Sequence, residues 1–456
     1  MEVDIKTAIK NQRQYFNQGH TKEIPFRITR LKTLEQAIKK NEEKIISALK
    51  RDLNKTAYES YLTEIGLILS EIRFTIKNVQ TWTQPQKVKT PFIYPFASSY
   101  NYPEPYGIVL VISPWNYPFQ LAMAPLIGAM AAGNCAVLKP SESSPHTSGI
   151  ISEILADNFE NQYIAAITGD AEIGKALLEQ KFDYIFFTGS VPLGKIVMAA
   201  ASKHLTPVTL ELGGKSPCIV DREASINLSA KRIVSGKFIN AGQTCIAPDY
   251  LVVHKSVKAD LVNCMQKYIK QFYGEQPRES KDYPRIINNL HFERVAAHLD
   301  KGDIIVGGET DQKQLYISPT LLDNIGWDDP VMQDEIFGPI LPMLEYQDLS
   351  QVIAAINARP KPLALYFFST NKQNQQRILK EISFGGGCIN DTLLHFASPH
   401  LPFGGVGNSG MGRYHGKASF DTFSHRKSIL KNRLSFDLPL RYPPYKNLKY
   451  LKKILR

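Results

Sequence analysis

The sequence is poor in the residues that define several familiar classes of protein. Its 456 residues include five cysteines, at positions 135, 218, 245, 264 and 388, and no Cys-x-x-Cys pair. An odd, scattered set of cysteines indicates neither a disulfide framework nor a zinc site, and the ten histidines show no ligand spacing. We therefore expect no metal site, and a cytoplasmic location where a thiol can stay reactive.

Long apolar runs are also scarce. The first ten residues are mixed in charge and lack the apolar core of a signal peptide. The longest uncharged run, Phe119 to Leu138, approaches membrane-spanning length, but Gln120, Pro125 and Gly133 interrupt it. We expect this run to form a buried helix, a stop at Gly133 and a strand.

Positive charge is concentrated at one end of the chain. The net charge is +11, and the range 426–456 holds ten Lys or Arg residues against one acid, Asp437, which gives +9 and leaves +2 for the rest. A nearly neutral body argues against a nucleic-acid partner. Two interpretations of the tail stay open: a solvated segment, or a short amphipathic helix, with Leu448, Leu451 and Leu455 on one side, that makes peripheral contact with an anionic membrane.

The order of apolar segments predicts an α/β fold. A chain of this length needs two or three domains. Residues 4–80 have helical periodicity, and a Pro-rich, aromatic segment at 85–105 indicates an extended excursion. Continuous apolar strands then alternate with helices, which is typical of a parallel sheet covered on both faces. We expect strands at 107–112, 135–138, 163–168 and 184–188, helices at 119–132, 148–158, 173–180 and from 192, and a second alternation over 218–368.

One strand-to-helix turn could hold a phosphate. Gly189, Gly194 and Lys195 have the spacing of a Walker A loop, but Ile196 stands where that loop needs a Mg²⁺-binding hydroxyl. The Gly-x-Gly-x-x-Gly fingerprint is also absent. Free amides at the following helix N-terminus would suit a pyrophosphate, and the position after a parallel strand favours a dinucleotide over a plain turn.

Cys245 is the strongest candidate nucleophile. It lies in the polar segment Asn240-Ala241-Gly242-Gln243-Thr244-Cys245, whereas the other cysteines except Cys388 fall in apolar strands or on an apolar helix face. A free thiol is mostly protonated at neutral pH, so we expect a helix N-terminus or a cation to activate it. Cys388, after three glycines, is the rival.

Three polar residues could assist a thiol nucleophile, although each also has a structural interpretation. Glu211 ends an apolar segment before two glycines, where partial burial would raise its pKa and suit a general base; it could instead form an ion pair. Asn116 follows the first strand and could donate to an oxyanion or simply satisfy a turn. Glu335 could hold a ribose hydroxyl or be an exposed loop acid.

Seven short segments occur together and in order along the chain. They are Pro114-Trp115-Asn116-Tyr117-Pro118, Lys139-Pro140-Ser141-Glu142, Phe187-Thr188-Gly189-Ser190, Glu211-Leu212-Gly213-Gly214-Lys215, Gly242-Gln243-Thr244-Cys245, Glu335-Ile336-Phe337-Gly338-Pro339 and Pro402-Phe403-Gly404-Gly405. With these segments, residues 5–445 resemble the aldehyde dehydrogenase superfamily. The short N-terminus and the ending Arg441-Tyr442-Pro443-Pro444-Tyr445 are most similar to its class 3-type branch, which includes fatty-aldehyde enzymes and Gram-positive members associated with carotenoid aldehydes.

The resemblance implies NAD(P)-dependent oxidation of an aldehyde, medium- or long-chain or otherwise apolar, to its acid. Cys245 would attack the aldehyde carbon, Asn116 would stabilise the thiohemiacetal oxyanion, and Glu211 would activate water to release the acid from the thioester. The NAD or NADP site would be formed by Ile112, Trp115, Lys139, Glu142, Gly189, Ser190, Glu335 and Phe337.

The resemblance also implies a domain plan and a homodimer. A Rossmann-like cofactor domain would comprise 1–83 and 104–211, and an α/β catalytic domain 212–398. A small β oligomerisation element would comprise 84–103 and 399–430, with a strand near 419–430, and 431–456 would be the basic tail.

Two other classes of function compete with this interpretation. A phosphoryl-transfer enzyme would use the loop at Gly189, but Ile196 counts against it. A non-catalytic protein that binds nucleic acid or membrane would suit a pI of about 9.1, but would leave Cys245, Glu211 and Asn116 unexplained.

Overall fold

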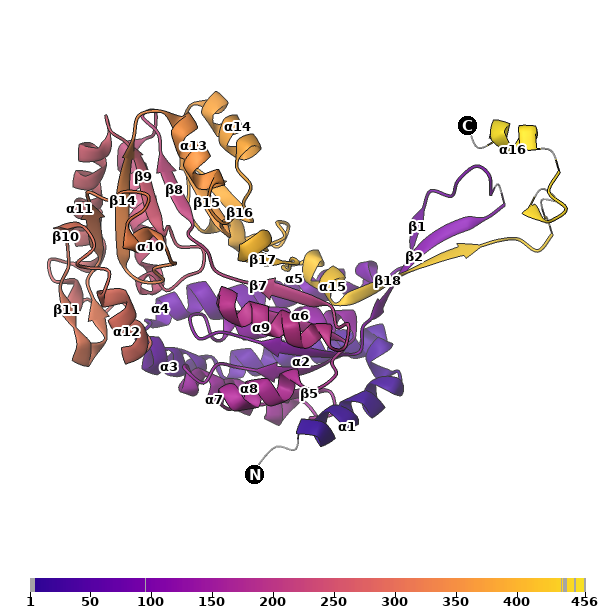
Figure 1. Ribbon diagram of the computed structural model, residues 1–456. Helices are drawn as coiled ribbons and strands as arrows, with labels where there is room; N and C mark the ends of the chain where they lie inside the picture. Colours follow the sequence, from indigo (N-terminus) through magenta and orange to yellow (C-terminus); the bar gives the residue numbers. More distant parts are fainter. Residues whose placement is uncertain (1–4, 95, 436, 438–440, 447, 455–456) are drawn as a thin grey trace.

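The computed structural model describes residues 5–94, 96–435, 437, 441–446 and 448–454. Figure 1 shows two α/β bodies and an arm that projects away from them. The predicted α/β class is confirmed, with one sheet of six strands and one of seven. Leu455, part of the predicted leucine stripe, lies outside the described residues.

Helices fill the N-terminal region, as its periodicity predicts. The last of them, α5, continues directly from a short π-helix, Tyr61–Ile65, so the backbone widens by one turn just before it. The helices are α1 (Ile5–Asn17), α2 (Ile24–Lys40), α3 (Glu42–Leu53), α4 (Ala57–Ser60) and α5 (Gly66–Trp82).

The six-stranded sheet has the order β17-β7-β6-β3-β4-β5, and only β17 is antiparallel to its neighbour. Its strands are almost wholly buried, because helices cover both faces. The strands are β3 (Ile108–Ile112), β4 (Cys135–Lys139), β5 (Ile164–Ala166), β6 (Tyr184–Thr188), β7 (Val208–Glu211) and β17 (Gly410–Met411), and the helices between them are α6 (Gln120–Ala132), α7 (Pro145–Asn158), α8 (Ala171–Leu178) and α9 (Val191–Ser202).

The uncharged run from Phe119 to Leu138 divides as predicted. All thirteen residues of α6 are buried, and Gly133 ends the helix in the left-handed conformation, with φ of 93°. Strand β4 follows at once. In the part of the chain that the structure describes, no helix has the length and apolarity needed to cross a bilayer.

The direction of strand order reverses between β3 and β6. The chain passes from β3 to β4 and β5 on one side, and β6 and β7 lie on the other. Loops that leave two such strands diverge, and the crevice between them is where open α/β sheets bind ligands. We therefore expect the ligand-binding site at the carboxyl ends of β3 and β6, and call this region the crevice.

The seven-stranded sheet has the order β10-β13-β14-β9-β8-β15-β16, parallel except for the β10–β13 pair. It confirms the predicted second alternation. Its strands are β8 (Pro217–Val220), β9 (Tyr250–His254), β10 (Asp303–Val306), β13 (Thr320–Asp323), β14 (Ile340–Tyr346), β15 (Ala364–Phe368) and β16 (Gly386–Ile389), with helices α10 (Ile226–Phe238), α11 (Lys258–Tyr273), α12 (Asn289–Ala296), α13 (Leu349–Asn357) and α14 (Lys372–Glu381).

The arm is an antiparallel sheet of β1 (Gln86–Val88), β2 (Ser98–Pro105) and β18 (Ser424–Lys431). The Pro-rich excursion is therefore extended, as predicted. The C-terminal strand begins at Ser424 rather than near 419, because Lys417–Thr422 forms helix α15. The described part of the tail holds one helix, α16 (Leu448–Ile454), beyond the arm (Figure 1).

Candidate active site

Most of the predicted site residues lie at one edge of the six-stranded sheet. Parallel strands end at the same edge, so the segments after β3, β4, β6 and β7 meet there. These segments hold Ile112, Trp115, Asn116, Lys139, Glu142, Gly189, Ser190 and Glu211.

Cys245 belongs to the other body, in the loop before β9. Asn240 and Ala241, just upstream, have left-handed backbones with φ of 51° and 50°, and Gly242 follows with φ of 72°. A Cβ on Gly242 would collide with the Gly338 carbonyl oxygen, so only glycine fits this turn. Cys245 is half-buried. The tight turn therefore delivers a thiol that substrate can reach.

Asn116 spans the two bodies. Its Nδ2 donates to the Gln243 carbonyl oxygen at 3.0 Å, and the neighbouring Tyr117 hydroxyl lies 2.7 Å from Thr244 Oγ1. An amide nitrogen carries two N–H groups, so a second one remains for an oxyanion formed beside Cys245. These bonds fix the oxyanion donor to the segment that carries the nucleophile.

Glu211 ends β7 and is buried, with 3% exposure. Neither of its carboxyl oxygens has a hydrogen-bond partner among the described residues, and burial raises its pKa well above the ordinary value. Strand β17 pairs with β7 here, placing Gly410 opposite Glu211. The ion pair that was the structural alternative for Glu211 is absent from the described residues, and neither carboxyl oxygen is engaged by another described group.

The surroundings of the Cys245 thiol favour its protonated form. Burial raises its pKa above the ordinary value, and the nearby carboxyls of Glu335 and Glu211 raise it further. The opposing groups are the backbone N–H groups of Cys245 and Ile246, and no cation is among the causes. The expected helix N-terminus or cation beside this thiol stays a prediction, and a base has to take the thiol proton before the sulfur can attack.

Glu335 faces the nucleophile as well as the cofactor crevice. Burial and the nearby Asp249 raise its pKa to about 8, against the opposing effect of the Gly214 N–H that it accepts. A Cβ on Gly213 would overlap its carboxylate, so the glycine leaves room for this side chain. A carboxyl that titrates near neutrality can either hold a ribose hydroxyl or take the thiol proton.

The crevice side of the edge suits a dinucleotide. Lys139 Nζ lies 2.5 Å from Glu142 Oε2, which presents a paired ammonium and carboxylate to a ribose. Ser190 is the N-cap of α9 and makes no side-chain cap bond, so its hydroxyl and the first amides of α9 can receive a pyrophosphate. The Thr188 and Ser113 hydroxyls, at the ends of β6 and β3, are buried without a partner among the described residues. These unsatisfied donors fit a bound nucleotide.

Three aromatic side chains cluster at Trp115, the neighbour of Asn116. The Trp115 ring lies 4.6 Å from the His291 ring and 5.4 Å, edge-on, from Phe337. Phe337 has a left-handed backbone with φ of 50°, and His291 Nδ1 is buried without a partner among the described residues. Strain in a bulky residue persists where the surroundings impose it, which is typical of a ligand site.

The rival thiol sits in a different setting. Cys388 Sγ lies 3.5 Å from His395 Nδ1, but burial raises the thiol pKa and lowers the imidazole pKa to about 4, so both stay neutral. Cys135 and Cys218 are fully buried, and Cys264 is half-buried on α11. Within the described ranges, no cluster of His, Cys, Asp and Glu side chains could hold a metal ion.

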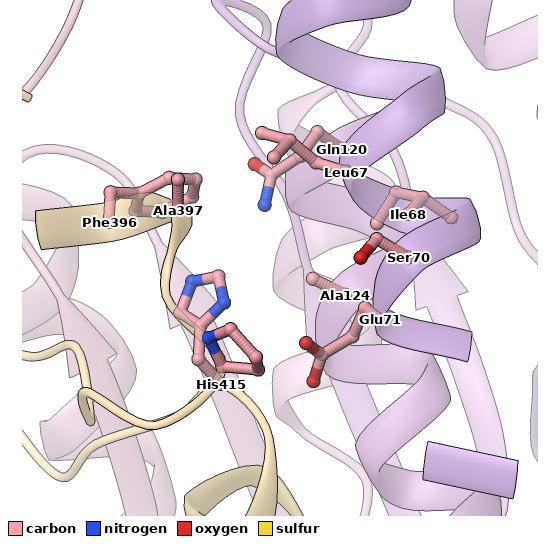
Figure 2. Close-up of a pocket in the computed structure, with 10 residues that line it drawn as sticks. Leu67, Ile68, Ser70, Glu71, Gln120, Ala124, Phe396, Ala397 and His415 are labelled. Carbon is pink, nitrogen blue, oxygen red and sulfur yellow. The ribbon is translucent and has the colours of Figure 1, made fainter. Parts of the chain in front are cut away.

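A pocket opens between α5, α6 and the loop before α15 (Figure 2). It holds about 370 Å³ of empty space, part of it open to solvent. Its lining residues are Leu67, Ile68, Ser70, Glu71, Gln120, Ala124, Phe396, Ala397, Pro399 and His415. Tyr414, the neighbour of His415, interacts electrostatically with Glu211 and Cys245 and with the Gln120 side chain, so the pocket adjoins the reactive groups.

Sequence reasoning missed several residues that shape the site. Asn240 Nδ2 donates to the Asn116 carbonyl oxygen at 2.7 Å, and Gln243 Nε2 donates to the Arg285 carbonyl oxygen at 2.9 Å. Both residues stood in the nucleophile segment, but nothing in the sequence named their partners. Lys55, Glu59 and Glu64 also reach this region, from a segment that showed only helical periodicity.

The comparisons with known proteins agree with this geometry. The sequence model of the Aldehyde dehydrogenase family matches residues 1–429. The 4,4'-diaponeurosporen-aldehyde dehydrogenase of Staphylococcus aureus is 50% identical over 99% of each chain. The rat enzyme called aldehyde dehydrogenase, dimeric NADP-preferring, is 45% identical and is covered to 98%. A solved substrate-bound state of Staphylococcus aureus AldH superposes with a TM-score of 0.98, at 49% identity over 100% of both chains.

A family match over nearly the whole chain, relatives of this identity and a shared fold leave no room for the phosphoryl-transfer alternative. The chain belongs to the aldehyde dehydrogenase family and is an NAD(P)-dependent oxidoreductase that converts aldehydes to carboxylic acids.

Proposed function

We propose that this enzyme oxidises a long, apolar aldehyde, with Cys245 as nucleophile, Asn116 as oxyanion donor and Glu211 as the base for acyl release. The observation that carries the proposal is the convergence of these three residues, from two bodies, at the crevice edge. The Staphylococcus aureus relative is named for a carotenoid aldehyde, which suits the same class of substrate.

The reaction begins with the loss of the thiol proton to a nearby carboxylate, Glu335 or Glu211. The sulfur then attacks the aldehyde carbon, and Asn116 Nδ2 and the Cys245 N–H hold the resulting oxyanion. A nicotinamide dinucleotide bound in the crevice supplies the acceptor for the hydride lost from that carbon. Glu211 next takes a proton from water, the hydroxide adds to the Cys245 thioester, and the acid leaves as the sulfur regains a proton.

Lys139 and Glu142 control the choice of cofactor in this proposal. The Glu142 carboxylate is half-exposed and would repel a 2′-phosphate if it stayed beside the ribose. It can swing into solvent and leave Lys139 to pair with that phosphate. The rat relative is named for a preference for NADP, and we propose that this chain accepts both cofactors.

The pocket in Figure 2 gives the aldehyde an apolar passage. Its lining combines apolar side chains, including Leu67, Ile68, Ala124 and Phe396, with the polar Ser70, Glu71, Gln120 and His415. Gln120 lines this pocket and is the first residue of α6. Tyr117, three residues earlier in the chain, contacts Thr244, the neighbour of Cys245. A long chain can place its tail among these side chains while its carbonyl reaches Cys245.

The experiment is a spectrophotometric assay of reduced nicotinamide with NAD and with NADP. Saturated aldehydes of increasing chain length and a polyene aldehyde form the substrate panel. The proposal predicts kcat/KM that rises with chain length and complete loss in Cys245→Ala. A normal rate in that variant, or a preference for short polar aldehydes, would contradict it.

We also propose a homodimer formed through the arm. Strand β18 is an edge strand of the arm, and β16 is an edge strand of the seven-stranded sheet. Exposed edges are templates for pairing with another chain. Leu430, 49% exposed on β18, would become buried in such a contact. Light scattering should give twice the 51.3 kDa chain mass, and Leu430→Asp should shift it toward the monomer.

The basic tail supports a second, independent proposal: peripheral contact with an anionic membrane. Helix α16 carries Lys449, Lys452 and Lys453, and its Leu448 and Tyr450 are 64% and 66% exposed. Exposed apolar groups between lysines suit a lipid surface. Anionic vesicles should co-sediment the full chain and not a 1–440 truncation; equal binding of the two would rule the contact out.

A further inference from the structure

Three buried charged side chains lie beside the site and have no part in the reaction steps. They are Lys55, Glu59 and Glu64, on the segment that includes α4 and the π-helix. Lys55 and Glu64 are fully buried, and Lys55 Nζ lies 2.6 Å from Glu64 Oε1. A buried ion pair adds little to stability relative to apolar residues, because both ions lose their hydration. Stability alone therefore gives no account of this pair.

Lys55 and Glu64 both reach the segment that carries Asn116. Lys55 Nζ donates to the Asn116 carbonyl oxygen at 3.2 Å. Glu64 Oε2 accepts from the Phe119 N–H at 2.9 Å, at the N-cap of α6. One ion pair thereby holds the backbone that follows the Asn116 side chain at two points, the Asn116 carbonyl and the Phe119 N–H.

Glu59 reaches the other half of the site. Its Oε1 accepts from the Asn240 N–H at 2.9 Å, where the left-handed turn before Cys245 begins. Asn240 Nδ2 in turn donates to the Asn116 carbonyl oxygen at 2.7 Å. One short segment therefore contacts both the backbone of the oxyanion donor and the left-handed turn. Lys55 Nζ and Asn240 Nδ2 both donate to the Asn116 carbonyl oxygen.

We propose that Lys55, Glu59 and Glu64 are positioning residues that hold the Asn116 amide and the nucleophile turn in register. The inference rests on the proposed roles of Asn116 and Cys245. Its physical reason is that an oxyanion donor must point to where charge develops, and a displacement of about 1 Å can cost about 10²-fold in rate. The π-helix widens the backbone where these side chains turn inward, a feature found often at functional sites.

The test is a double-mutant cycle in the full-length enzyme. Lys55→Met with Glu64→Gln removes both charges and leaves an acceptor for the Phe119 N–H. We expect kcat to fall about 10- to 100-fold, while the KM for NAD and the rate of Cys245 alkylation by iodoacetamide stay unchanged. In an Asn116→Ala background the same pair should cost nothing further, because its effect passes through Asn116.

A matched control and a second variant keep the outcome decisive. Asp221 is a buried carboxylate that accepts from Ser369 and Asn374, and it follows β8 at the sheet edge opposite Cys245. Asp221→Asn should lower the thermal midpoint and leave kcat unchanged. If the Lys55→Met, Glu64→Gln variant fails to fold, two Glu59 variants provide the test. Glu59→Gln keeps the acceptor for the Asn240 N–H and should retain kcat, whereas Glu59→Ala removes that acceptor and should lower kcat.

Two results would overturn the inference: multiplicative losses in the cycle, or equal kcat in Glu59→Gln and Glu59→Ala. Failure of the proposed function is a separate outcome. It would appear as aldehyde oxidation that persists at the wild-type rate in the Cys245→Ala or Asn116→Ala variant.

Discussion

Replacing Glu211 by Gln tests the proposed base with two independent readouts. The change keeps the size of the side chain and removes its ability to ionise. The carboxyl is 3% exposed and lacks hydrogen-bond partners in the part of the chain that the structure describes. Its burial raises its pKa well above the ordinary value.

The first readout is the time course of reduced cofactor. Attack by Cys245 and hydride loss do not require Glu211 if Glu335 takes the thiol proton, but hydrolysis of the thioester does. We expect one equivalent of reduced cofactor per active site in a rapid burst, followed by a steady rate reduced about 10²- to 10⁴-fold, the usual contribution of a general base. Rapid mixing at high enzyme concentration measures both phases.

The second readout is stability as a function of pH. Because the folded-state pKa of Glu211 is raised, the unfolded chain releases this proton first as pH rises through about 4.5, the ordinary value. Ionisation of Glu211 therefore does not change the free energy of unfolding below that pH. Above it, ionisation in the unfolded chain lowers the free energy of unfolding by at most about 1.4 kcal/mol per pH unit, until Glu211 also ionises in the folded protein. The unpaired Gln amide has its own cost of about 1–3 kcal/mol, which does not vary with pH.

The informative quantity is thus the change with pH of the stability difference between the variant and the wild type, and not the size of that difference at one pH. The thermal midpoint of Glu211→Gln minus that of the wild type should increase from pH 5 to pH 8. A constant difference across that range would mean that Glu211 ionises normally in the folded enzyme. A burst-free time course with a slow first turnover would mean that Glu211 acts before the thioester forms, and would refute the assigned step.

Three further predictions address the cofactor, the passage and the thiol. Glu142→Gln should shift the ratio of kcat/KM for NADP over NAD upward about tenfold, about 1.4 kcal/mol, since it removes a carboxylate from beside the ribose; an unchanged ratio would place Glu142 elsewhere. Ala124→Phe should raise the KM for long aldehydes at least tenfold and leave short ones unaffected, because it fills the apolar pocket; equal effects on both would mean that substrate enters by another route. The wild-type kcat/KM should rise as pH passes about 8, where Glu335 ionises, and Glu335→Gln should flatten that rise; an unaltered profile in the variant would assign the thiol proton to Glu211.

Strand order predicts that several cofactor-side residues lie at one edge of the sheet, whereas their roles came from the resemblance to the family. Asn116, Lys139, Gly189 and Glu211 each come directly after or at the end of a buried strand. Parallel strands finish at one edge, so residues separated by up to 95 positions must meet there once the strands are identified. Hydrophobic runs identify the strands without knowledge of any contact.

The supports of the site could not be predicted in the same way. Lys55 contacts Asn116, and Glu59 contacts a residue 181 positions away. Lys55 lies in the connection between α3 and α4 and Glu59 lies in α4, in a region whose apolar spacing predicts helices and gives no reason for a buried charge. Burial of a Lys or Glu depends on a partner that packing alone brings near, so periodicity would place these side chains in solvent.

The chemistry of the thiol shows how far residue types can mislead about electrostatics. Lysines are abundant in the sequence, and a cation beside Cys245 was a reasonable expectation. The groups that act on the sulfur instead include the carboxyls of Glu335 and Glu211, and burial raises the pKa of all three groups. A protonated thiol is a weak nucleophile and resists adventitious oxidation, since only the thiolate reacts readily. Proton removal by Glu335, whose pKa burial raises to about 8, would generate the thiolate, and Asn116 Nδ2 would then donate a hydrogen bond to the oxyanion formed when the sulfur attacks the aldehyde.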